Sequence, residues 1–374
     1  MSKLQELIKE LCPDGVEFKK LEEVCEIFSG KNKQKKEQGK YPVYGSTGII
    51  AYCDNYQYDK EQLLIARVGA NAGFIHIANG KYDVSDNTLI VDVIGTCNSI
   101  YIYYVLVNSN INRYSKGGGQ PLVTASDIKK IEIPLPPLEI QNEIVRILDT
   151  FTAHTAELQA ELQARKEQYE HYRNKSLTFD ENDERVKWIK LGEIGNTCMC
   201  KRIMKHQTSD IGEVPFFKIG TFGKEADAFI SYELYDEYKN KYSFPRKGEI
   251  LISASGTIGR TVIYDGQDAY FQDSNIIWIQ NDESKVLNKY LYYYYQIIEW
   301  NVEGGTIKRL YNTNLSKTII AYPPLSEQKR IISILDKFES LVNDLSEGLP
   351  AEIAAVQEQY EYYRNKLLTF KRKS

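Results

Sequence analysis

Two stretches of the chain carry apolar residues at the spacing of an amphipathic helix. After Pro136 and Pro137, apolar side chains recur in steps built from threes and fours, at Ile140, Ile144, Ile147, Phe151, Leu158 and Leu162. The same spacing returns at Ile331, Leu335, Phe338, Val342, Leu345, Leu349, Ile353, Val356, Tyr360, Tyr363 and Leu367. A helix with one apolar stripe is stable in water only when the stripe is covered, and each helix is the natural partner of the other. The pattern predicts two long helices that pair as an antiparallel coiled coil, with a break in the second at Gly348 and Pro350.

The other segments are shorter and have the patterns of strands, turns and short helices. Residues 16–21 and 186–191 alternate apolar and polar side chains, and apolar runs occur at 62–66, 88–91, 249–253 and 275–279. Glycines follow two of these runs, at Gly69 and Gly73 and at Gly256 and Gly259, and a strand-to-strand turn is the simplest interpretation. Tyrosine-rich helices are predicted over residues 100–107 and 290–298. The fold class is therefore α+β.

The chain also contains an internal repeat. Residues 167–179 return as residues 358–370 with two differences in thirteen positions, and Pro136 and Gln141 return 187 residues later as Pro323 and Gln328. A repeat of this kind predicts two similar units related by a pseudo-twofold axis. We expect globular domains over residues 1–135 and 181–322, and long helices over residues 136–180 and 323–374. The second half carries about 17 extra residues before Leu251.

Composition and charge narrow the class of protein. Apolar residues make up 42% of the chain, which is enough for real cores, but no apolar run is long enough to cross a bilayer. The N-terminus lacks the pattern of a secretion signal, so we expect a cytoplasmic protein without a membrane partner. The six cysteines have no zinc-site spacing, and we expect no metal and no cofactor. Because the net charge is −4, a polyanion would have to be met by local basic patches.

Two basic segments occupy corresponding places in the two halves. The first contains Lys31, Lys33, Lys35 and Lys36, and the second contains Lys201, Arg202 and Lys205. Either segment alone is read most simply as a solvated loop. Positive charge that recurs at the same place in two otherwise diverged halves favours contact with phosphate groups.

Two motifs suggest catalysis superficially, but both fail on spacing or residue type. Asp14, Glu17 and Lys19 are too close together for the metal carboxylates of a nuclease, and the second copy has Lys187 and Ile189 instead of the last two. The Leu-Pro-Pro-Leu segment at residues 135–138 lacks the polar and aromatic residues with which adenine methyltransferases hold a flipped base. These prolines are better explained as the stop before a helix. We expect no catalytic residue.

The repeated motifs of this chain resemble those of a known protein family. A globular unit, a Pro-Pro-Leu motif with a Gln three residues on, and a long helix occur in this order twice, which is similar to the specificity subunit of type I restriction-modification systems. The opening Leu-Cys-Pro-Asp-Gly-Val-Glu-Phe at residues 11–18 resembles it as well. The resemblance covers essentially the whole chain. It implies two target-recognition domains that each read one half of a split sequence in double-stranded DNA, and paired helices that dock two methyltransferase subunits.

The resemblance also assigns roles to the partners and to residues of this chain. Restriction subunits join through the methyltransferases, and these partners methylate adenine and cut DNA. Two unlike readers on a spacer give an asymmetric, bipartite site. Besides the basic segments, the candidate DNA contacts are Arg67, Asn71, Gln120, Ser255, Arg260, Lys308 and Arg309. The candidates for helix pairing and subunit docking are Pro137, Leu138, Ile144, Leu148, Phe151, Tyr169, Tyr172, Pro324, Leu325, Ile331, Leu335, Phe338, Tyr360 and Tyr363.

Two other classes of function compete with this interpretation. A scaffold whose globular units bind protein or glycan would show no sequence preference for DNA. An autonomous DNA methyltransferase or nuclease would need a cofactor or metal site, and the sequence offers none that we can recognise.

Overall fold

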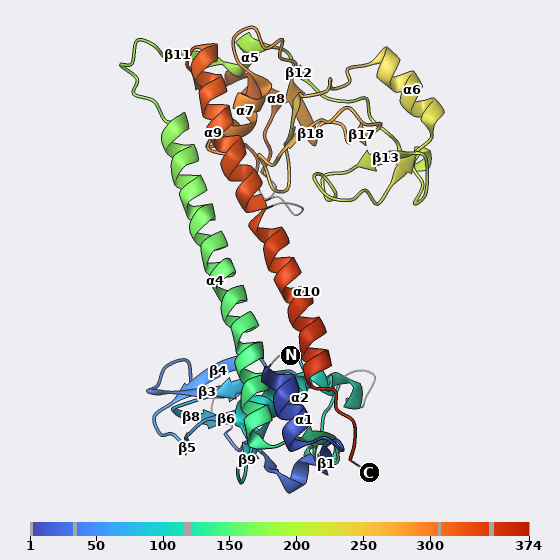
Figure 1. Cartoon of the computed structure of the whole chain (residues 1–374). Coiled ribbons are helices and arrows are strands. Elements are labelled where there is room, and N and C mark those ends of the chain that lie inside the picture. The colour runs from blue at the N-terminus through green and yellow to red at the C-terminus, as the bar shows by residue number, and fades with distance from the viewer. Residues whose placement is uncertain (1–2, 33–35, 116–120, 306–307, 344–347, 374) are drawn as a thin grey trace. The chain divides into compact units, whose positions relative to one another are not determined.

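The computed structural model describes residues 3–32, 36–115, 121–305, 308–343 and 348–373 and divides the chain into two compact units. Unit 1 contains Met1–Gln159 and Glu352–Ser374, and unit 2 contains Ala160–Ala351. The long helix α4 (Leu138–Leu177) belongs to unit 1 as far as Gln159 and to unit 2 from Ala160 on. Each unit therefore combines a globular part with the start of one long helix and the end of the other. Figure 1 labels many of the elements named below.

Unit 1 contains a two-stranded sheet and two four-stranded sheets. In the two-stranded sheet, β1 (Glu17–Lys20) pairs antiparallel with β10 (Glu132–Leu135). The first four-stranded sheet has the order β2 (Cys25–Ser29), β9 (Thr88–Val93), β6 (Gln62–Ala66) and β7 (Ile75–Ala78). The second has the order β4 (Gly48–Cys53), β3 (Tyr41–Gly45), β8 (Lys81–Val84) and β5 (Tyr58–Asp59). The helices of the globular part are α1 (Lys3–Leu11), η1 (Leu21–Glu23), α2 (Ser99–Asn108), η2 (Ile111–Tyr114) and α3 (Ala125–Lys129).

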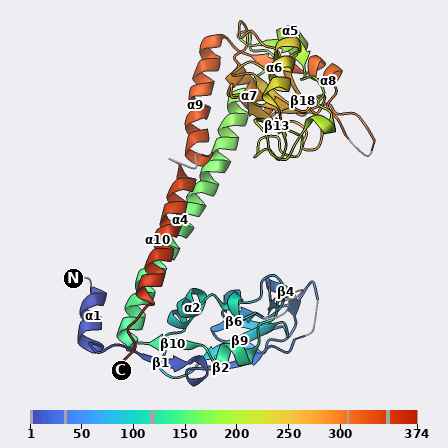
Figure 2. The ribbon, with the colours of Figure 1, turned by 90° about the vertical axis from the view of Figure 1, so that its right-hand side faces the viewer.

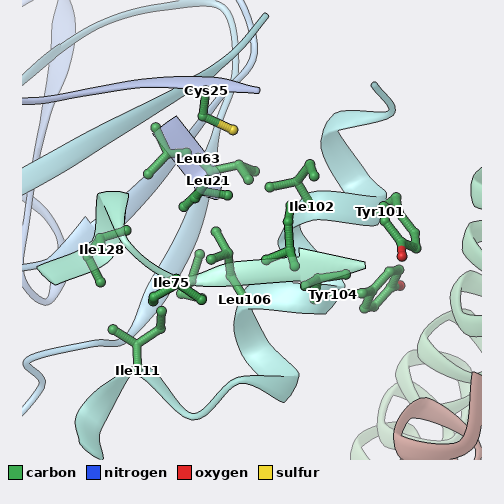
Figure 3. Packing of buried hydrophobic residues seen from close by; sticks show 14 of the residues in the cluster. Leu21, Cys25, Leu63, Ile75, Tyr101, Ile102, Tyr104, Leu106, Ile111 and Ile128 are labelled. Atoms are coloured by element: carbon green, nitrogen blue, oxygen red, sulfur yellow. The ribbon is translucent and has the colours of Figure 1, made fainter. Parts of the chain in front are cut away.

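The core of unit 1 lies between the first sheet and α2. Leu63 from β6 and Ile102 and Leu106 from α2 are fully buried, and Figure 3 shows them packed together with Ile75 and Ile128. The start of α4 joins this core through Ile140, Ile144 and Leu148. Figure 2 shows α1 beside the first turns of α4, where Lys3 Nζ lies 2.8 Å from Glu143 Oε2. The globular part and the long helix thus share one hydrophobic core.

Unit 2 repeats the same framework. Strand β11 (Lys187–Lys190) pairs antiparallel with β19 (Ile319–Tyr322). A four-stranded sheet has the order β12 (Thr197–Cys198), β18 (Ile276–Ile279), β15 (Ile250–Ser253) and β16 (Thr261–Ile263). A three-stranded sheet has the order β14 (Phe229–Ile230), β13 (Val214–Phe217) and β17 (Tyr270–Phe271). The helices of the globular part are α5 (Leu191–Ile194), η3 (Lys205–Gln207), α6 (Tyr232–Lys241), α7 (Asn288–Tyr295) and α8 (Asn312–Lys317).

Comparison of the units confirms the predicted strands and turns. The strands β6 and β15 lead through the glycine turns into the antiparallel partners β7 and β16, with φ of +81° at Gly69 and +65° at Gly256. The tyrosine-rich helices are α2 and α7. The second is shorter than predicted, because α7 ends at Tyr295 and leaves Ile297 and Ile298 outside the helix.

The second long helix is interrupted as the sequence predicts. Helix α9 (Leu325–Asn343) and helix α10 (Leu349–Leu367) are separate, and Gly348 lies directly before α10. Pro350 occupies the first turn of α10, where its missing N–H costs nothing because the first-turn donors have no helical partner. Residues 344–347 lie outside the described part.

Candidate nucleic-acid interface

A buried glutamine fastens each globular part to its long helix. In unit 1, Gln141 Oε1 accepts from the backbone N–H of Asn98 at 2.9 Å, and Nε2 donates to Pro136 O at 2.8 Å. In unit 2, Gln328 Oε1 accepts from the backbone N–H of Leu287 at 2.9 Å. Its Nε2 donates to Pro323 O at 2.8 Å and to Lys285 O at 2.9 Å. The repeat identifies both glutamines, but only the structure shows that each ties the start of its long helix to the segment before α2 or α7.

Buried tyrosines form a second set of repeated contacts at the same junctions. Tyr101 Oη donates to Pro134 O at 2.9 Å, and Tyr290 Oη donates to Ala321 O at 3.0 Å. Tyr104 Oη donates to Asp149 Oδ1 at 2.6 Å, and Tyr293 Oη likewise donates to Asp336 and to Glu339. Burial raises the pKa of all four tyrosines above the ordinary value, so their hydroxyl groups keep donating even at mildly alkaline pH.

The long helices pair in both units through stacked aromatic rings. In unit 1, Phe151 of α4 stacks on Tyr363 of α10, with ring centroids 5.5 Å apart. In unit 2, Phe338 of α9 stacks on Tyr172 of α4 at the same 5.5 Å. Phe151 and Phe338 are repeat equivalents, as are Tyr172 and Tyr363, so the two units repeat one contact with the roles of the helices exchanged. This is the arrangement of antiparallel helices that the sequence predicts.

The remaining helix candidates divide into two groups. Ile144, Leu148, Ile331 and Leu335 are buried in the cores of their own units, so they bind each helix to its globular part as well as forming a seam. Tyr169 and Tyr360 also pack against these cores, with the guanidinium groups of Arg173 and Arg364 each 5.3 Å from a ring. Leu138 and Leu325, which follow Pro137 and Pro324, are instead 40% and 38% exposed. These two leucines are therefore accessible on the surface, which leaves them available for subunit docking.

In unit 1, the structure gathers part of the candidate DNA-contact set around the second sheet. The backbone N–H of Lys31 donates to Val84 O of β8 at 3.1 Å, and Lys36 Nζ lies 3.0 Å from Asp54 Oδ2. Arg67 is half-buried at the end of β6, and its Nε has no hydrogen-bond partner among the described residues. Asn71 is exposed in the following turn. Lys33, Lys35 and Gln120 lie outside the described residues.

In unit 2, several candidates converge on the segment that precedes β18. Arg202 Nε donates to Asp273 Oδ2 at 2.8 Å, Ser255 Oγ donates to Asn275 Oδ1 at 2.9 Å, and the Arg309 guanidinium donates to Ser274 O. Two other candidates, Lys205 and Lys308, are exposed. The remaining two candidates, Arg260 and Lys201, contact other parts of unit 2.

Arg260 Nη1 donates to Phe222 O at 2.9 Å. The ammonium group of Lys201 lies 5.0 Å from the ring centre of Tyr242. The structure therefore brings Arg202, Ser255 and Arg309 together, whereas Arg260 and Lys201 contact other parts of unit 2.

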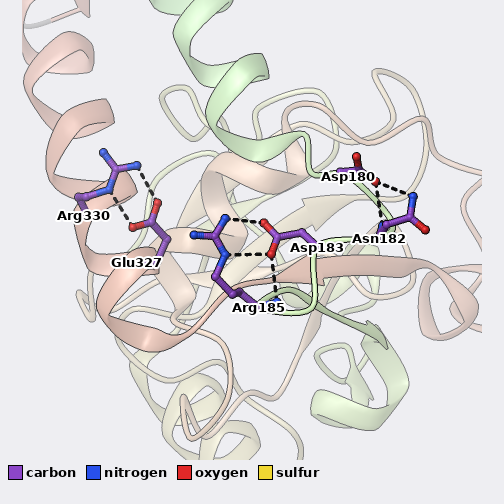
Figure 4. Close-up of polar contacts among 6 residues, drawn as sticks. All are labelled: Asp180, Asn182, Asp183, Arg185, Glu327 and Arg330. Carbon is purple, nitrogen blue, oxygen red and sulfur yellow. Dashed lines mark hydrogen bonds and ion pairs between the residues drawn. The ribbon is translucent and has the colours of Figure 1, made fainter.

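Other arginines of unit 2 are neutralised by carboxylates close in sequence. Figure 4 shows Arg185 paired with Asp183 and Arg330 paired with Glu327. The Arg185 guanidinium donates to both carboxylate oxygens at 2.9 and 2.8 Å and lowers the pKa of Asp183 to about 2. In the described part of the chain, no three His, Cys, Asp or Glu side chains form a metal-binding group. The described helices also include none apolar and long enough to span a membrane.

Comparison with known proteins places this architecture in a family. A family model for the type I restriction modification DNA specificity domain matches residues 13–168 and 183–355. A putative type I restriction enzyme specificity subunit from Haemophilus influenzae is 49% identical over 371 residues, which cover 95% of this chain and 96% of that protein. The EcoR124I/EcoR124II specificity subunit of Escherichia coli is 32% identical over 291 residues, or 72% of this chain and 70% of that one.

Solved structures share the fold. The crystal structure of the S subunit of a type I system from M. genitalium aligns with a TM-score of 0.59 at 15% identity, covering 95% of this chain and 96% of that one. A chain from a structural study of the assembly and conformational transition of the type I system aligns with a TM-score of 0.62 at 18% identity, covering 96% and 98%. Because the family model covers both repeats and the Haemophilus relative matches the chain along nearly its whole length, this chain belongs to the type I restriction-modification DNA specificity family.

Proposed function

We propose that each unit reads one half of a split, asymmetric sequence in double-stranded DNA, on behalf of a type I restriction-modification complex. The observation that carries this proposal is that the two units share a framework but differ in their second sheets. The shared framework is consistent with both units binding DNA, whereas the different second sheets are consistent with binding different base sequences. The DNA contacts would come from the recognition domains at residues 1–135 and 181–322, through the basic segments and the candidate groove residues.

The helix junctions would dock two copies of one methyltransferase subunit. The exposed apolar residues there occur in equivalent pairs: Leu138 and Leu325 are 40% and 38% exposed, and Tyr172 and Tyr363 are both 40% exposed. A surface that occurs twice can bind the same partner twice. Restriction subunits would then join through the methyltransferases. Methylation of adenine and cleavage would belong to these partners, and this chain would act in the cytoplasm without catalysing either step.

Exchange of one recognition domain tests the division of labour. Residues 1–135 are replaced with the corresponding domain of another family member, and the chimera is expressed with its methyltransferase subunits. Sequencing of the methylated adenines in the host genome should show that one half of the target has changed and the other half has not. The reciprocal exchange of residues 181–322 is the matched control and should change only the other half. A change in both halves after one exchange would disprove modular reading.

The absence of catalysis has its own test. The purified chain, incubated with DNA and a methyl donor in the absence of other subunits, should leave the DNA unmodified and uncut. Methylation or cleavage by the chain alone would establish an enzyme instead.

A further inference from the structure

The two units differ most in the strands and helices that flank the centre of the second sheet. Both sheets contain the same parallel pair, β3 with β8 in unit 1 and β13 with β17 in unit 2. On this shared pair, unit 1 builds the strands β4 and β5, whereas unit 2 builds β14 followed by helix α6. The extra residues that the sequence places before Leu251 include this helix. The first sheets, in contrast, have equivalent strand orders in both units.

In both units, the basic segment is attached to the part of the second sheet that differs. In unit 1, Lys36 forms an antiparallel bridge with Tyr52 of β4, and the N–H of Tyr52 donates to Lys36 O at 3.0 Å. In unit 2, Lys201 O accepts from Tyr270 Oη of β17 at 3.0 Å, and the Lys201 ammonium lies 5.0 Å from the ring centre of Tyr242, directly after α6. The same type of segment thus contacts unlike elements.

Exposed tyrosines accompany the lysines at both places. Tyr52 and Tyr56 are 39% and 42% exposed in unit 1, and Lys81 Nζ lies 4.8 Å from the ring centre of Tyr56. In unit 2, Tyr242 is 44% exposed. We call the two groups the lysine–tyrosine patches: Lys36, Tyr52, Tyr56 and Lys81 in unit 1, and Lys201, Lys241 and Tyr242 in unit 2.

We propose that the lysine–tyrosine patches contact the DNA directly, and that they make the half-site of unit 1 different from that of unit 2. This inference rests on the proposed function and assigns its specificity to the second sheets. Lysines provide the phosphate contacts, and exposed tyrosine side chains provide a hydroxyl group and an apolar ring that can meet base edges or sugars from a groove of the duplex. Because the two units would read different half-sites, elements that differ between the units are suited to produce that difference.

Single exposed tyrosines are common on protein surfaces and by themselves indicate nothing. The proposal rests instead on the same combination of side chains appearing in both units on elements that are not equivalent. The ion pairs in the patches do not oppose it. Lys36 pairs with Asp54 and Lys241 with Glu237, both at 3.0 Å, and all four side chains are about half exposed. Exposed pairs of this kind contribute only about 0–1 kcal/mol, so phosphate groups can compete for the lysines.

Substitutions in the unit 2 patch test the proposal in the complex with the methyltransferase subunits. Tyr242→Ala should weaken binding to the cognate duplex by at least about fivefold, which corresponds to about 1 kcal/mol, the lower end of the loss for one base contact. It should also reduce discrimination against mismatches in the half-site that unit 2 reads, as identified by the domain exchange. Discrimination in the other half-site should stay unchanged. Tyr56→Ala should produce the reverse pattern.

Trp188→Ala serves as a control, and Lys201→Ala tests the charge of the patch. Trp188 is also 44% exposed but lies on β11, away from the second sheet, so Trp188→Ala should bind as the wild type does. Lys201→Ala removes one charge without touching the core, and should reduce the dependence of log affinity on log salt concentration by about one. All three tryptophans, Trp188, Trp278 and Trp300, belong to unit 2, so their fluorescence reports whether the Tyr242 variant is folded.

Two results overturn the proposal while leaving the proposed function intact. One is unchanged half-site discrimination in folded Tyr242→Ala, and the other is an unchanged salt dependence in Lys201→Ala, each alongside a wild-type complex that selects its target. A wild-type complex without sequence preference would instead contradict the proposed function itself.

Discussion

Replacing Glu249 with glutamine should stabilise unit 2, and the gain should depend on pH. Glu249 is 2% exposed, directly before β15. Its Oε2 accepts from the backbone N–H of Arg246 at 2.8 Å, but its Oε1 has no hydrogen-bond partner among the described residues. Burial raises the pKa of this carboxyl group, against the smaller lowering effects of its contacts with Arg246, with the Trp278 side chain and with the Asn281 backbone. The equivalent position of unit 1 holds a neutral side chain, Gln62, which is also 2% exposed.

The sign of the pH effect follows from the raised pKa. Below the unfolded-state pKa, about 4.3, Glu249 is neutral in both states and costs unit 2 nothing as an ion. As the pH rises through the folded-state pKa, the folded protein must ionise a buried carboxyl group, and stability is lost. Glu249→Gln removes this loss. Because a tenfold change in an ionisation constant corresponds to about 1.4 kcal/mol, we expect a gain of about 1 kcal/mol or more at high pH and a much smaller one at acidic pH.

Urea unfolding followed by tryptophan fluorescence measures this gain, because all three tryptophans lie in unit 2. With a urea slope of about 2 kcal/mol per molar, the midpoint of Glu249→Gln should rise by about 0.5 M or more at pH 8. Glu193→Gln, at an exposed position of the same unit, is the matched control and should leave the midpoint unchanged. A shift of equal size at every pH, or no shift at pH 8, would refute the view that Glu249 is a costly buried charge.

Three further predictions concern the junctions between the helices and the globular parts. Gln328→Ala leaves the buried Leu287 N–H and two carbonyl groups without a partner. Unit 2 should therefore lose about 2–4 kcal/mol of unfolding free energy in the same fluorescence assay. A loss under about 0.5 kcal/mol would contradict the fastening role. Phe338→Ala removes the ring stacked on Tyr172 and should lower the unfolding free energy of unit 2 by about 1–3 kcal/mol. Phe338→Leu keeps an apolar side chain there and should recover part of this loss. Equal losses in the two variants would argue against packing as the cause. Arg146 and Lys3 lower the pKa of Glu143 to about 2, so its contribution to unit 1 is present above pH 4–5 and is lost as the pH falls toward 2. Glu143→Gln should flatten that acid-induced loss in a thermal unfolding series between pH 6 and pH 2.5, and an unchanged pH profile would show that the carboxylate has no such role.

The periodicity and the repeat were sufficient to predict much of the architecture. Both long helices, their break before Pro350, the strands at β6 and β15 and the turns at Gly69 and Gly256 follow from side-chain spacing and from the φ angles that glycine permits. These features are local, because a helix or turn depends on residues within a few positions. The order of the motifs along the chain was also enough to suggest the family.

The other features of the structure depend on contacts between residues that are distant in sequence. The apolar stripe that contains Ile144 and Leu148 predicts that one face of the helix is buried. Only the fold shows that this face packs against the core of the globular part and the end of the other long helix. The pairing of Phe151 with Tyr363 joins residues from the two repeats, and periodicity within one segment cannot specify that partner. Likewise, the basic segments were visible as charge, but their attachment to Tyr52 in unit 1 and to Tyr242 in unit 2 depends on long-range packing. The sequence by itself determined which surfaces must be buried or charged, and the tertiary structure decided which residues meet there, because contact depends on how distant segments fold together.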